Sequence, residues 1–418
     1  MSLQAPVAAL DATAISRISD GHHEPDWLRA LRASWLERAE ATPWPSGAEE
    51  EWRRTSLDKL PRDLELLDNA GGVRCALEDE YAAAGVIFSD IRTALSEHPE
   101  LIRRYLGGEG SLESHAHFWA LAQAAWTGGL FLYVPAGVEI DRTLVARSAL
   151  GRGDVAYYPL SLVVAERDSS VTLLEEVVSP DGAAGWFGGI VEIHALDGAR
   201  VRYANLQRLG DGTWNIGAQR VVVGQDANVT TLNAEVGSRV TKVGLDVQMA
   251  GKGGTSRLLG ILAAGEDQQI DINSLQNLSA SHTTSDLLYL SALYDRAKAS
   301  FYGVIKIQPE ARATSSYQEC RNLLLSTEAG ASPIPVLEIM NNDIIRCGHG
   351  ATAGAIDPVM MFYAQSRGLD PDDAERMIVR GFFEQVVSKI EDETIRGRVL
   401  EALVARIGSS ELLADEAA

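Results

Sequence analysis

The spacing of hydrophobic residues changes character twice along the chain and predicts three regions. Between residues 25 and 128, apolar residues recur at the helical period, first from Asp26 and then near Asp90–Leu106 and Ser114–Trp126. Pro43 ends the first of these helices, because proline lacks the backbone N–H that a helix interior requires. We therefore expect a mainly helical N-terminal region over residues 25–128.

Residues 129–340 consist instead of short apolar and β-branched runs broken by Gly, Asp and Asn, which is typical of strands. Three of these runs begin at Val171, Val201 and Val229, roughly 30 residues apart. Small turns such as Asp197-Gly-Ala199 precede them. This spacing, without long intervening helices, favours the coils of a β-solenoid over a doubly wound sheet. Sandwich and jelly-roll arrangements stay open at this point.

Helical signals return in the third region, residues 341–408. Asp357-Pro358 and Asp370-Pro371 each combine an N-cap carboxylate with a proline in the first turn, and Gly368 fits the position after a helix C-terminus. Within the second of these helices, one face is expected to carry Ala374, Met377, Ile378, Gly381, Phe382 and Val386; a third helix is expected to bury Ile395, Val399, Leu403, Val404 and Ile407. For any one such helix, packing within the chain is favoured over binding a partner.

The two ends of the chain lack a periodic pattern, so we expect disorder over residues 1–24 and 409–418. The formal net charge is −21, which disfavours binding to nucleic acid or to anionic lipid. No signal peptide is recognisable and no apolar run approaches the ~18 residues of a membrane span. Three widely spaced cysteines form no disulfide framework. Together these features predict a soluble protein in a reducing cytoplasm.

The segment Asn341–Gly354 holds the strongest candidate for chemistry, because Cys347 and His349 lie two residues apart beside several glycines. In an extended strand such residues share a face, so a thiolate and an imidazole could bind one iron or zinc ion. A stable site takes about four ligands, and the twenty residues on either side contain no further Cys or His. The missing ligands must come from elsewhere in the fold or from another chain, and we interpret the pair as an interface site.

For Cys347, the neighbouring Arg346 is expected to favour the thiolate, and the competing interpretation is a buried apolar cysteine. His349 is the strongest single candidate, against a histidine that only caps a turn. Cys320 is a secondary candidate that fits a structural role better, since no Cys or His is close to it in sequence. His115 and His117 are excluded as a metal pair, because residues two apart lie on different faces of a helix.

The chain shows no motif for nucleotide hydrolysis. The glycine-rich segment 250–256 lacks the order of residues found in a phosphate-binding loop and no helix is expected after it, and no nucleophile elbow or HExxH motif occurs. We therefore expect a protein without catalytic activity.

Several motifs in the same order resemble the SufB/SufD family of bacterial iron–sulfur cluster assembly scaffolds. The similarity is carried by Cys347-Gly-His-Gly-Ala-Thr-Ala-Gly354, Asp357, Phe362-Tyr363, Ser366-Arg-Gly368, Tyr317-Gln318, Asn322-Leu-Leu-Leu-Ser326, Pro335, Leu337-Glu-Ile339, Leu130-Phe-Leu-Tyr-Val-Pro135 and Glu50-Glu-Trp-Arg-Arg-Thr55. It runs from about residue 48 to 390. The Cys-x-His pair followed by Gly-Ala-Thr is similar to the SufD branch, because the SufB branch lacks that pair.

The resemblance implies a right-handed parallel β-helix core, flanked by helical segments at both ends of the chain, that pairs with a SufB-like paralogue. It also implies that an ABC-type ATPase of the SufC kind docks on the segment from Pro358 to about Ile390. Within that segment, the residues that match the family are Pro358, Phe362, Tyr363, Arg367, Gly368, Met377 and Phe382. His349 and Cys347 would hold iron or a nascent iron–sulfur cluster shared with the paralogue. Reduced flavin is associated with the family complex, but no residue here marks a flavin site.

Two other functions compete with this interpretation. A polysaccharide lyase or hydrolase on a parallel β-helix would need carboxylates gathered in one groove, whereas acids such as Asp246 and Asp271 are scattered along the sequence. A homodimeric scaffold that acts without a paralogue is the other alternative.

Overall fold

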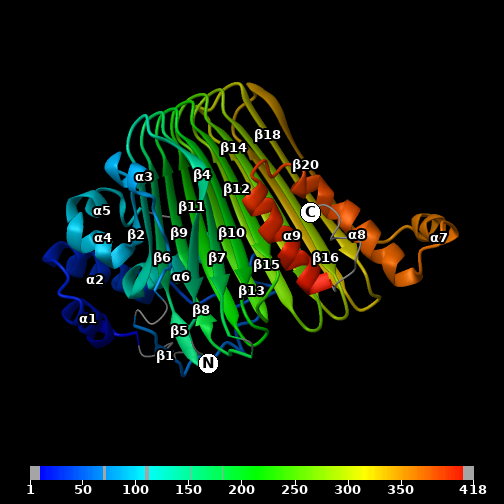
Figure 1. Ribbon diagram of the computed structural model, residues 1–418, viewed down its shortest axis with the longest axis horizontal. Coiled ribbons are helices and arrows are strands. Elements are labelled where there is room, and N and C mark those ends of the chain that lie inside the picture. The colour runs from blue at the N-terminus through cyan, green and yellow to red at the C-terminus, as the bar shows by residue number, and fades with distance from the viewer. Residues whose placement is uncertain (1–9, 69–71, 109–112, 152, 181, 408–418) are drawn as a thin grey trace.

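The computed structural model describes residues 10–68, 72–108, 113–151, 153–180 and 182–407. Two parallel sheets face each other as the walls of a β-solenoid, with helices at both ends of the chain (Figure 1). The eight-stranded sheet has the order β20 (Ile344–Ala355), β18 (Thr314–Leu324), β16 (Thr284–Leu293), β14 (Thr255–Ala264), β12 (Asn228–Glu235), β10 (Arg200–Arg208), β7 (Ser170–Val178) and β4 (Glu139–Ala149).

The second sheet has twelve strands and one antiparallel edge. Its main path is β19 (Gly330–Ile339), β17 (Lys298–Ile307), β15 (Gln269–Leu278), β13 (Val240–Met249), β11 (Trp214–Val223), β9 (Ile190–Ala195), β6 (Pro159–Ala165), β3 (Gly128–Val134) and β2 (Ile87–Asp90). β1 (Glu65–Leu66), β5 (Val155–Tyr157) and β8 (Trp186–Phe187) lie off this path. Only β2 pairs antiparallel, with β3, among these strands. The predicted parallel β-helix fold is confirmed.

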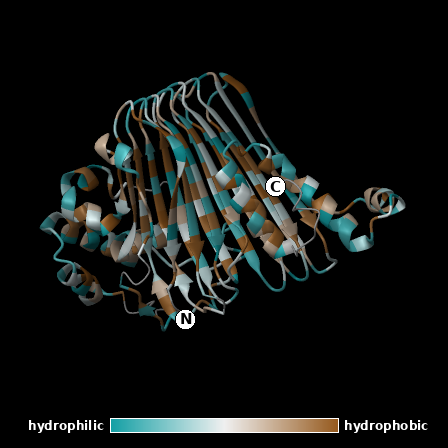
Figure 2. Ribbon diagram, in the orientation of Figure 1, coloured by the Kyte–Doolittle hydropathy of each residue, from teal (hydrophilic) through white to brown (hydrophobic). Residues whose placement is uncertain are grey.

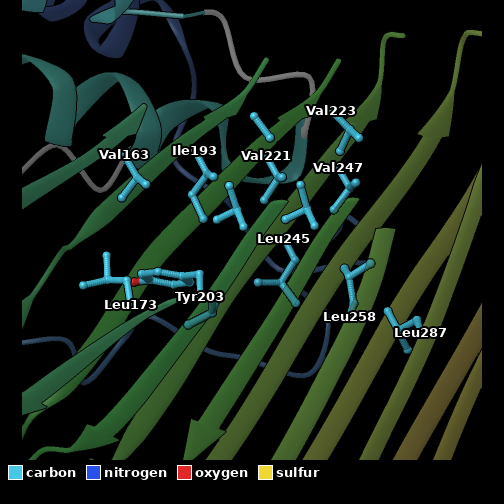
Figure 3. Close-up of a cluster of buried hydrophobic side chains, with 14 of the residues drawn as sticks. Val163, Leu173, Ile193, Tyr203, Val221, Val223, Leu245, Val247, Leu258 and Leu287 are labelled. Carbon is cyan, nitrogen blue, oxygen red and sulfur yellow. The ribbon is translucent and has the colours of Figure 1, made fainter. Parts of the chain in front are cut away.

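The predicted period of about 30 residues is confirmed by the strand register. Val201 pairs with Val171 on one side and with Val229 on the other, so the three predicted strand starts stack directly on one another. On the facing sheet, Val221 lies between Ile193 and Val247. Figure 3 shows Ile193, Val221 and Val247, together with Leu173, Tyr203 and Leu258, in the space between the two sheets. Figure 2 shows hydrophobic segments recurring across neighbouring strands.

One row of corner residues turns the chain into the eight-stranded sheet. Asp168, Asp226 and His282 all have left-handed backbones, with φ between 53° and 61°. Each donates its backbone N–H to the turn of the next coil, as from His282 to Arg312 O at 2.8 Å. Aspartate, asparagine, histidine and glycine tolerate this conformation better than bulkier residues do. His282 is therefore a turn residue.

The solenoid includes more of the chain than residues 129–340. Strand β20 continues the eight-stranded sheet, and Cys347 within it pairs with Ser316 of β18. The boundary predicted at residue 341 is therefore wrong: the Cys-x-His segment is the last strand of the core rather than part of a separate C-terminal unit. The sequence obscured this because glycine and alanine dominate the second half of β20.

The N-terminal helices gather at the first coils of the solenoid, and most of them pack on the outer face of the larger sheet (Figure 1). They are α1 (Ala12–Gly21), α2 (Asp26–Ala41), α3 (Asp79–Ala83), α4 (Ile91–Glu97), α5 (Pro99–Tyr105), the 3₁₀ turn η2 (Glu113–His115) and α6 (Ala116–Ala125). The disorder predicted for residues 1–24 is wrong for the described part, because Asp11 caps α1 and Ile15 and Ile18 are buried. Residues 1–9 lie outside the described part of the chain, as does the predicted tail at 409–418.

A buried ion pair fastens this N-terminal region to the solenoid. Lys242 Nζ lies 2.8 Å from the carboxylate of Asp271 and also donates to Glu51 O and to the amide oxygen of Asn273. Thr55 donates its hydroxyl to the same aspartate. Since both charges are almost fully buried, breaking the pair by removing one partner would be strongly destabilising.

The C-terminal helices are α7 (Pro358–Ser366), α8 (Pro371–Val387) and α9 (Glu393–Ile407). The predicted N-caps Asp357 and Asp370 each accept a backbone N–H at 2.8 Å, and Gly368 has φ +100°. Helices α8 and α9 pack on the outer face of the eight-stranded sheet, so packing within the chain is confirmed for both.

The buried face of α8 differs from the predicted one. Ala374 and Val386 are buried as expected, but Val379, Phe383 and Val387 complete the face, while Met377 is 43 % exposed. The sheet beneath the helix, and not the sequence period alone, selects which side of α8 is covered. In α9, the predicted residues Ile395, Val399 and Leu403 are buried.

Among the described residues, the model contains no helix that is both long enough and apolar enough to span a membrane.

The interior of the solenoid also contains ionisable groups. Glu235 is buried and accepts hydrogen bonds from Gln207 at 2.9 Å and Asn215 at 3.4 Å. Burial raises the pKa of its carboxyl group to about 7, although both hydrogen bonds act in the opposite direction. Glu175, also buried, has its pKa raised by burial in the same way.

Glu235 should make the stability of the protein fall as pH rises. Its carboxyl group binds a proton more tightly in the folded than in the unfolded chain, so its stabilisation is complete below about pH 4.5 and is lost as pH rises to about 7. We expect Glu235→Gln, which mimics the protonated form, to raise the free energy of unfolding above pH 7 by up to about 3 kcal/mol. Urea unfolding of both proteins at pH 5.5 and 8 measures this. An equal effect at both pH values would contradict the assignment.

Candidate functional site

Cys347 and His349 lie on β20, which is the last strand of the eight-stranded sheet. Their register partners on β18 are Ser316 and Gln318, which are both buried inside the solenoid. Because side chains alternate along a strand, Cys347 and His349 also face the inner side of the last coil. The predicted shared face of the pair agrees with this register.

The last coil is open, so these inward positions reach the surface. Cys347 is half-buried against the inner core, whereas His349 is exposed. On its outer side, β20 has no described strand to pair with, and the same holds for β19 in the other sheet. The apolar side chains Ile339, Met340 and Ile345 are exposed near this edge. We refer to β19, β20 and these three residues as the open edge.

The predicted activation of Cys347 by Arg346 is wrong. Partial burial raises the pKa of the Cys347 thiol, and no charged group offsets this effect. Arg346 lies on the opposite face of β20, where it pairs with Asp286 at 2.7 Å and stacks on Tyr317. Adjacent residues of a strand point to opposite faces, which is why a neighbour in sequence is not a neighbour in space here. At neutral pH, Cys347 of the isolated chain is therefore a neutral thiol.

Cys320 lies deeper, on β18, and is 3 % exposed. Its Sγ receives a long contact from Asn322 Nδ2 at 3.6 Å, and burial raises its pKa to about 12. The partner of Cys347 on β18 is Ser316, four residues from Cys320, which corresponds to roughly 13 Å along the strand. The two cysteines therefore cannot bind one ion together, and the packing of Cys320 fits the structural role favoured from the sequence.

The chain by itself does not complete a metal site in its described part. No group of three or more His, Cys, Asp or Glu residues is arranged there to hold one ion. Cys347 and His349 thus provide two donors of the roughly four that a stable site needs. Both residues lie on the open edge, which donors of a second chain could approach.

Helix α7 forms a second exposed surface. It projects beyond the last strands of the solenoid (Figure 1), and only Ala364 of its nine residues is buried. Two predicted docking residues, Phe362 and Tyr363, are 72 % and 60 % exposed. Arg367 lies over the Tyr363 ring at 5.1 Å and donates to its hydroxyl.

The other predicted docking residues differ in how far they are exposed. Pro358 opens α7 and is exposed, Gly368 forms the turn after it, and Met377 is exposed on α8. Phe382 instead packs partly against the core beneath α8. Sequence reasoning overlooked Val359 and Met360, which are 71 % and 54 % exposed. The signal was present, because Val-Met-Met-Phe-Tyr makes this short helix apolar on every side.

Most of the residues that sequence reasoning excluded as site residues have structural roles. His117 Nδ1 contacts Thr42 O at 2.8 Å, while His115 lies apart from it on η2 and is buried. Asp246 and Asp271 are both buried, the second against Lys242, so neither is an exposed carboxylate of the kind that a sugar-cleaving groove needs.

Comparison with known proteins agrees with this arrangement. The family described as SUF system FeS cluster assembly, SufBD core domain, matches residues 148–382, and the SufBD protein N-terminal region matches residues 69–145. The iron-sulfur cluster assembly protein SufD of Bacillus subtilis is 27 % identical over 96 % of this chain and 98 % of its own length.

Two staphylococcal relatives are similar to this chain as well. An iron-sulfur cluster assembly SufBD family protein of Staphylococcus saprophyticus is 25 % identical over 90 % of this chain and 88 % of its own length. Another of Staphylococcus epidermidis is 29 % identical over 75 % of this chain and 67 % of its own length. The solenoid, the open edge and the matched core domain, which covers more than half of the residues, lead to one conclusion: the chain belongs to the SufBD family of iron–sulfur cluster assembly proteins.

Proposed function

We propose that this protein is the SufD-type subunit of an iron–sulfur cluster assembly scaffold. It pairs through the open edge with a SufB-like paralogue and recruits a SufC-like ABC ATPase through α7. The observation that carries the proposal is the pair Cys347 and His349 on β20, an edge strand that pairs with β18 on one side and has no described strand on the other. Iron, or the nascent cluster, is the cargo at this junction, and the scaffold itself catalyses no reaction.

The open edge is suited to a second solenoid. An edge strand offers a row of unpaired N–H and C=O groups, which proteins normally protect with charges, prolines, bulges or covering segments. Here β20 instead carries the exposed apolar Ile345 and a run of small residues ending at Ala355. Small side chains let another backbone approach closely. A paralogue with the same coil spacing can continue both sheets and bring further ligands to His349.

Helix α7 is suited to a groove on a partner. Large exposed apolar side chains that are clustered on one short element mark protein interaction sites. Val359, Met360, Phe362 and Tyr363 form such a cluster, and Arg367 adds a cation beside it. The ATPase must come from another chain, since this one has no phosphate-binding loop.

The pairing proposal predicts selective protection of one cysteine. In the isolated protein, iodoacetamide should modify Cys347 faster than Cys320, because Cys347 is half-exposed and Cys320 is buried with a pKa raised to about 12. Binding of the SufB-like paralogue should slow the modification of Cys347 about tenfold or more. Peptide mass spectrometry after timed labelling at pH 8 measures both rates. Cys75, near the other end of the solenoid and also half-exposed, is the internal control, and equal protection of Cys75 would contradict edge pairing.

If the protein is a scaffold subunit, it should form a complex of fixed composition, and loss of His349 should lower the metal content of that complex. Co-expression with the SufB-like and SufC-like proteins should give one copy of each scaffold subunit and two ATPases, which native mass spectrometry can measure. His349→Ala should leave this complex intact but lower its iron and sulfide content, measured after anaerobic preparation, about tenfold. Removing a residue that only hydrogen-bonds to a metal ligand already weakens a metal site by about that factor, and removing the ligand itself weakens the site at least as much. His282→Asn, on an exposed turn, is the matched control.

Different results separate the alternatives. Normal iron and sulfide in the His349→Ala complex would remove its role as a ligand while leaving the scaffold in place. A folded protein that forms only a complex with itself would support the homodimeric scaffold, and one that stays monomeric would contradict the pairing proposal.

Helix α7 provides a separate test of ATPase recruitment. Phe362→Asp should weaken binding of the ATPase by about 2 kcal/mol or more, because a charge replaces a large apolar contact. Pairing with the SufB-like paralogue should not change. Isothermal titration with the purified ATPase measures the affinity. Val145→Asp, which alters an exposed residue on β4 far from α7, is the control; loss of binding in both variants would indicate misfolding instead of a local contact.

A further inference from the structure

A small polar cavity of about 40 Å³ lies inside the solenoid, between the two sheets. Strands β7, β10 and β12 contribute one wall, and β6, β9 and β11 contribute most of the other. The space is large enough for roughly three water molecules. Its lining includes two carboxylates and five side-chain amides, namely Glu175, Glu235, Asn205, Gln207, Asn215, Gln219 and Asn233.

The carboxylate of Glu175 has all the partners that it needs within the protein. Its Oε1 accepts hydrogen bonds from Ser148 at 2.9 Å and from Ser161 at 2.8 Å, and its Oε2 accepts one from Tyr203 at 2.9 Å. Burying a carboxyl group is costly unless such partners are present. Glu175 therefore gives no reason to expect a ligand.

Glu235 has partners on one of its two oxygens only. The hydrogen bonds from Gln207 and Asn215 both end on Oε2, and no group of the described chain donates to Oε1. Unlike the fully enclosed polar atoms of the interior that lack a partner, Oε1 retains accessible surface. Because Glu235 is only 2 % exposed and lines the cavity, this free oxygen faces the cavity.

Two amide oxygens of the lining are in the same state. The Nδ2 atoms of Asn205 and Asn215 donate to Tyr203 Oη and to Glu235 Oε2, both at 3.4 Å, which distinguishes the nitrogen of each amide from its oxygen. The two Oδ1 atoms accept no hydrogen bond from described groups and retain accessible surface. Three oxygens with free lone pairs thus meet one cavity, and the described lining contains no Lys, Arg or His.

We propose that this cavity binds one alkali-metal cation, K⁺ or Na⁺, on the ionised carboxylate of Glu235 and the amide oxygens of Asn205 and Asn215. Hard cations take oxygen ligands, and water that shares the cavity completes the shell. One positive charge balances one carboxylate, whereas a divalent ion would leave a net charge buried in the core. The site is separate from the open edge and does not depend on a partner subunit.

Protons and the cation compete for Glu235. Burial raises the pKa of its carboxyl group to about 7, so below that pH the protonated carboxyl should hold no cation. The other titratable groups around it are Glu175, Tyr203 and Tyr289. Burial raises the pKa of both tyrosines well above the usual value, so they stay neutral, and it also raises the pKa of Glu175. The cation should therefore bind above pH 7.

The test compares the full chain in KCl, NaCl and choline chloride at equal concentration. At pH 8, we expect K⁺ or Na⁺ to raise the melting temperature by about 2 °C or more relative to choline, which is too large for the cavity. A ligand that binds only the folded state stabilises it by mass action. The difference between the salts should disappear at pH 5.5. Equilibrium dialysis against the stabilising salt, with the metal measured by mass spectrometry, should show one bound cation per chain at pH 8.

Three variants locate the effect within the cavity. Glu235→Gln keeps the volume but removes the charge, so it should abolish the difference between the salts at pH 8. Asn205→Leu removes one oxygen and leaves the hydrogen bonds of Glu235 in place, and it should lower the difference by about half. Glu175→Gln, which alters the other carboxylate of the same cavity, is the matched control and should leave the difference unchanged.

Two results would overturn the proposal. Equal melting temperatures in the three salts at pH 8, with no cation bound in dialysis, would mean that the cavity holds water only. A difference between the salts that persists at pH 5.5 or in Glu235→Gln would place the cation elsewhere on the protein. The dialysis and the comparison of the two pH values use the unaltered chain, so they decide the question even where a variant does not fold.

Discussion

The structure depends on one constraint: each coil must present the same hydrogen-bonding register to the next. Val171, Val201 and Val229 stack because the coils between them differ by only two residues in length, 30 against 28. Parallel strands satisfy their backbone groups only through both neighbours, so each interior coil is complete only once the next has formed. Strands β19 and β20 have no successor in the described chain. The open edge is therefore a direct consequence of how the core is built.

Local signals in the sequence were sufficient for part of this architecture. The helix starts at Asp357 and Asp370 and the strand starts of the solenoid could be predicted, because a capping carboxylate or a turn before a β-branched run acts over a few residues. The Cys347 and His349 pair was also visible, since its spacing alone implies a shared strand face. What the spacing could not show was that this strand is the final one, which depends on the register of β18.

Other features required long-range contacts that no local pattern contains. Lys242 and Asp271 form their ion pair across neighbouring strands and then reach Glu51 and Thr55, roughly 190 to 216 residues away. Arg346 was expected beside Cys347, but the alternation of the strand sends it to Asp286 instead. The rotated buried face of α8 and the formation of helix α1 also depend on contacts with distant parts of the chain. In each case a tertiary surface, rather than the residue's own neighbours, decides which side chain is covered.

The two exposed surfaces are joined by very little chain. Strand β20 ends at Ala355 and α7 begins at Pro358, with the cap residue Asp357 between them. A partner that holds α7 therefore pulls on the strand that carries His349, because the two connecting residues provide almost no slack. Helices α8 and α9 are anchored on the outer face of the sheet, whereas only Ala364 of α7 is buried, so α7 is the helix of this region that a partner can displace most easily. Under the proposed function, a conformational change in the ATPase would act first on the open edge, where cluster ligands from two chains meet.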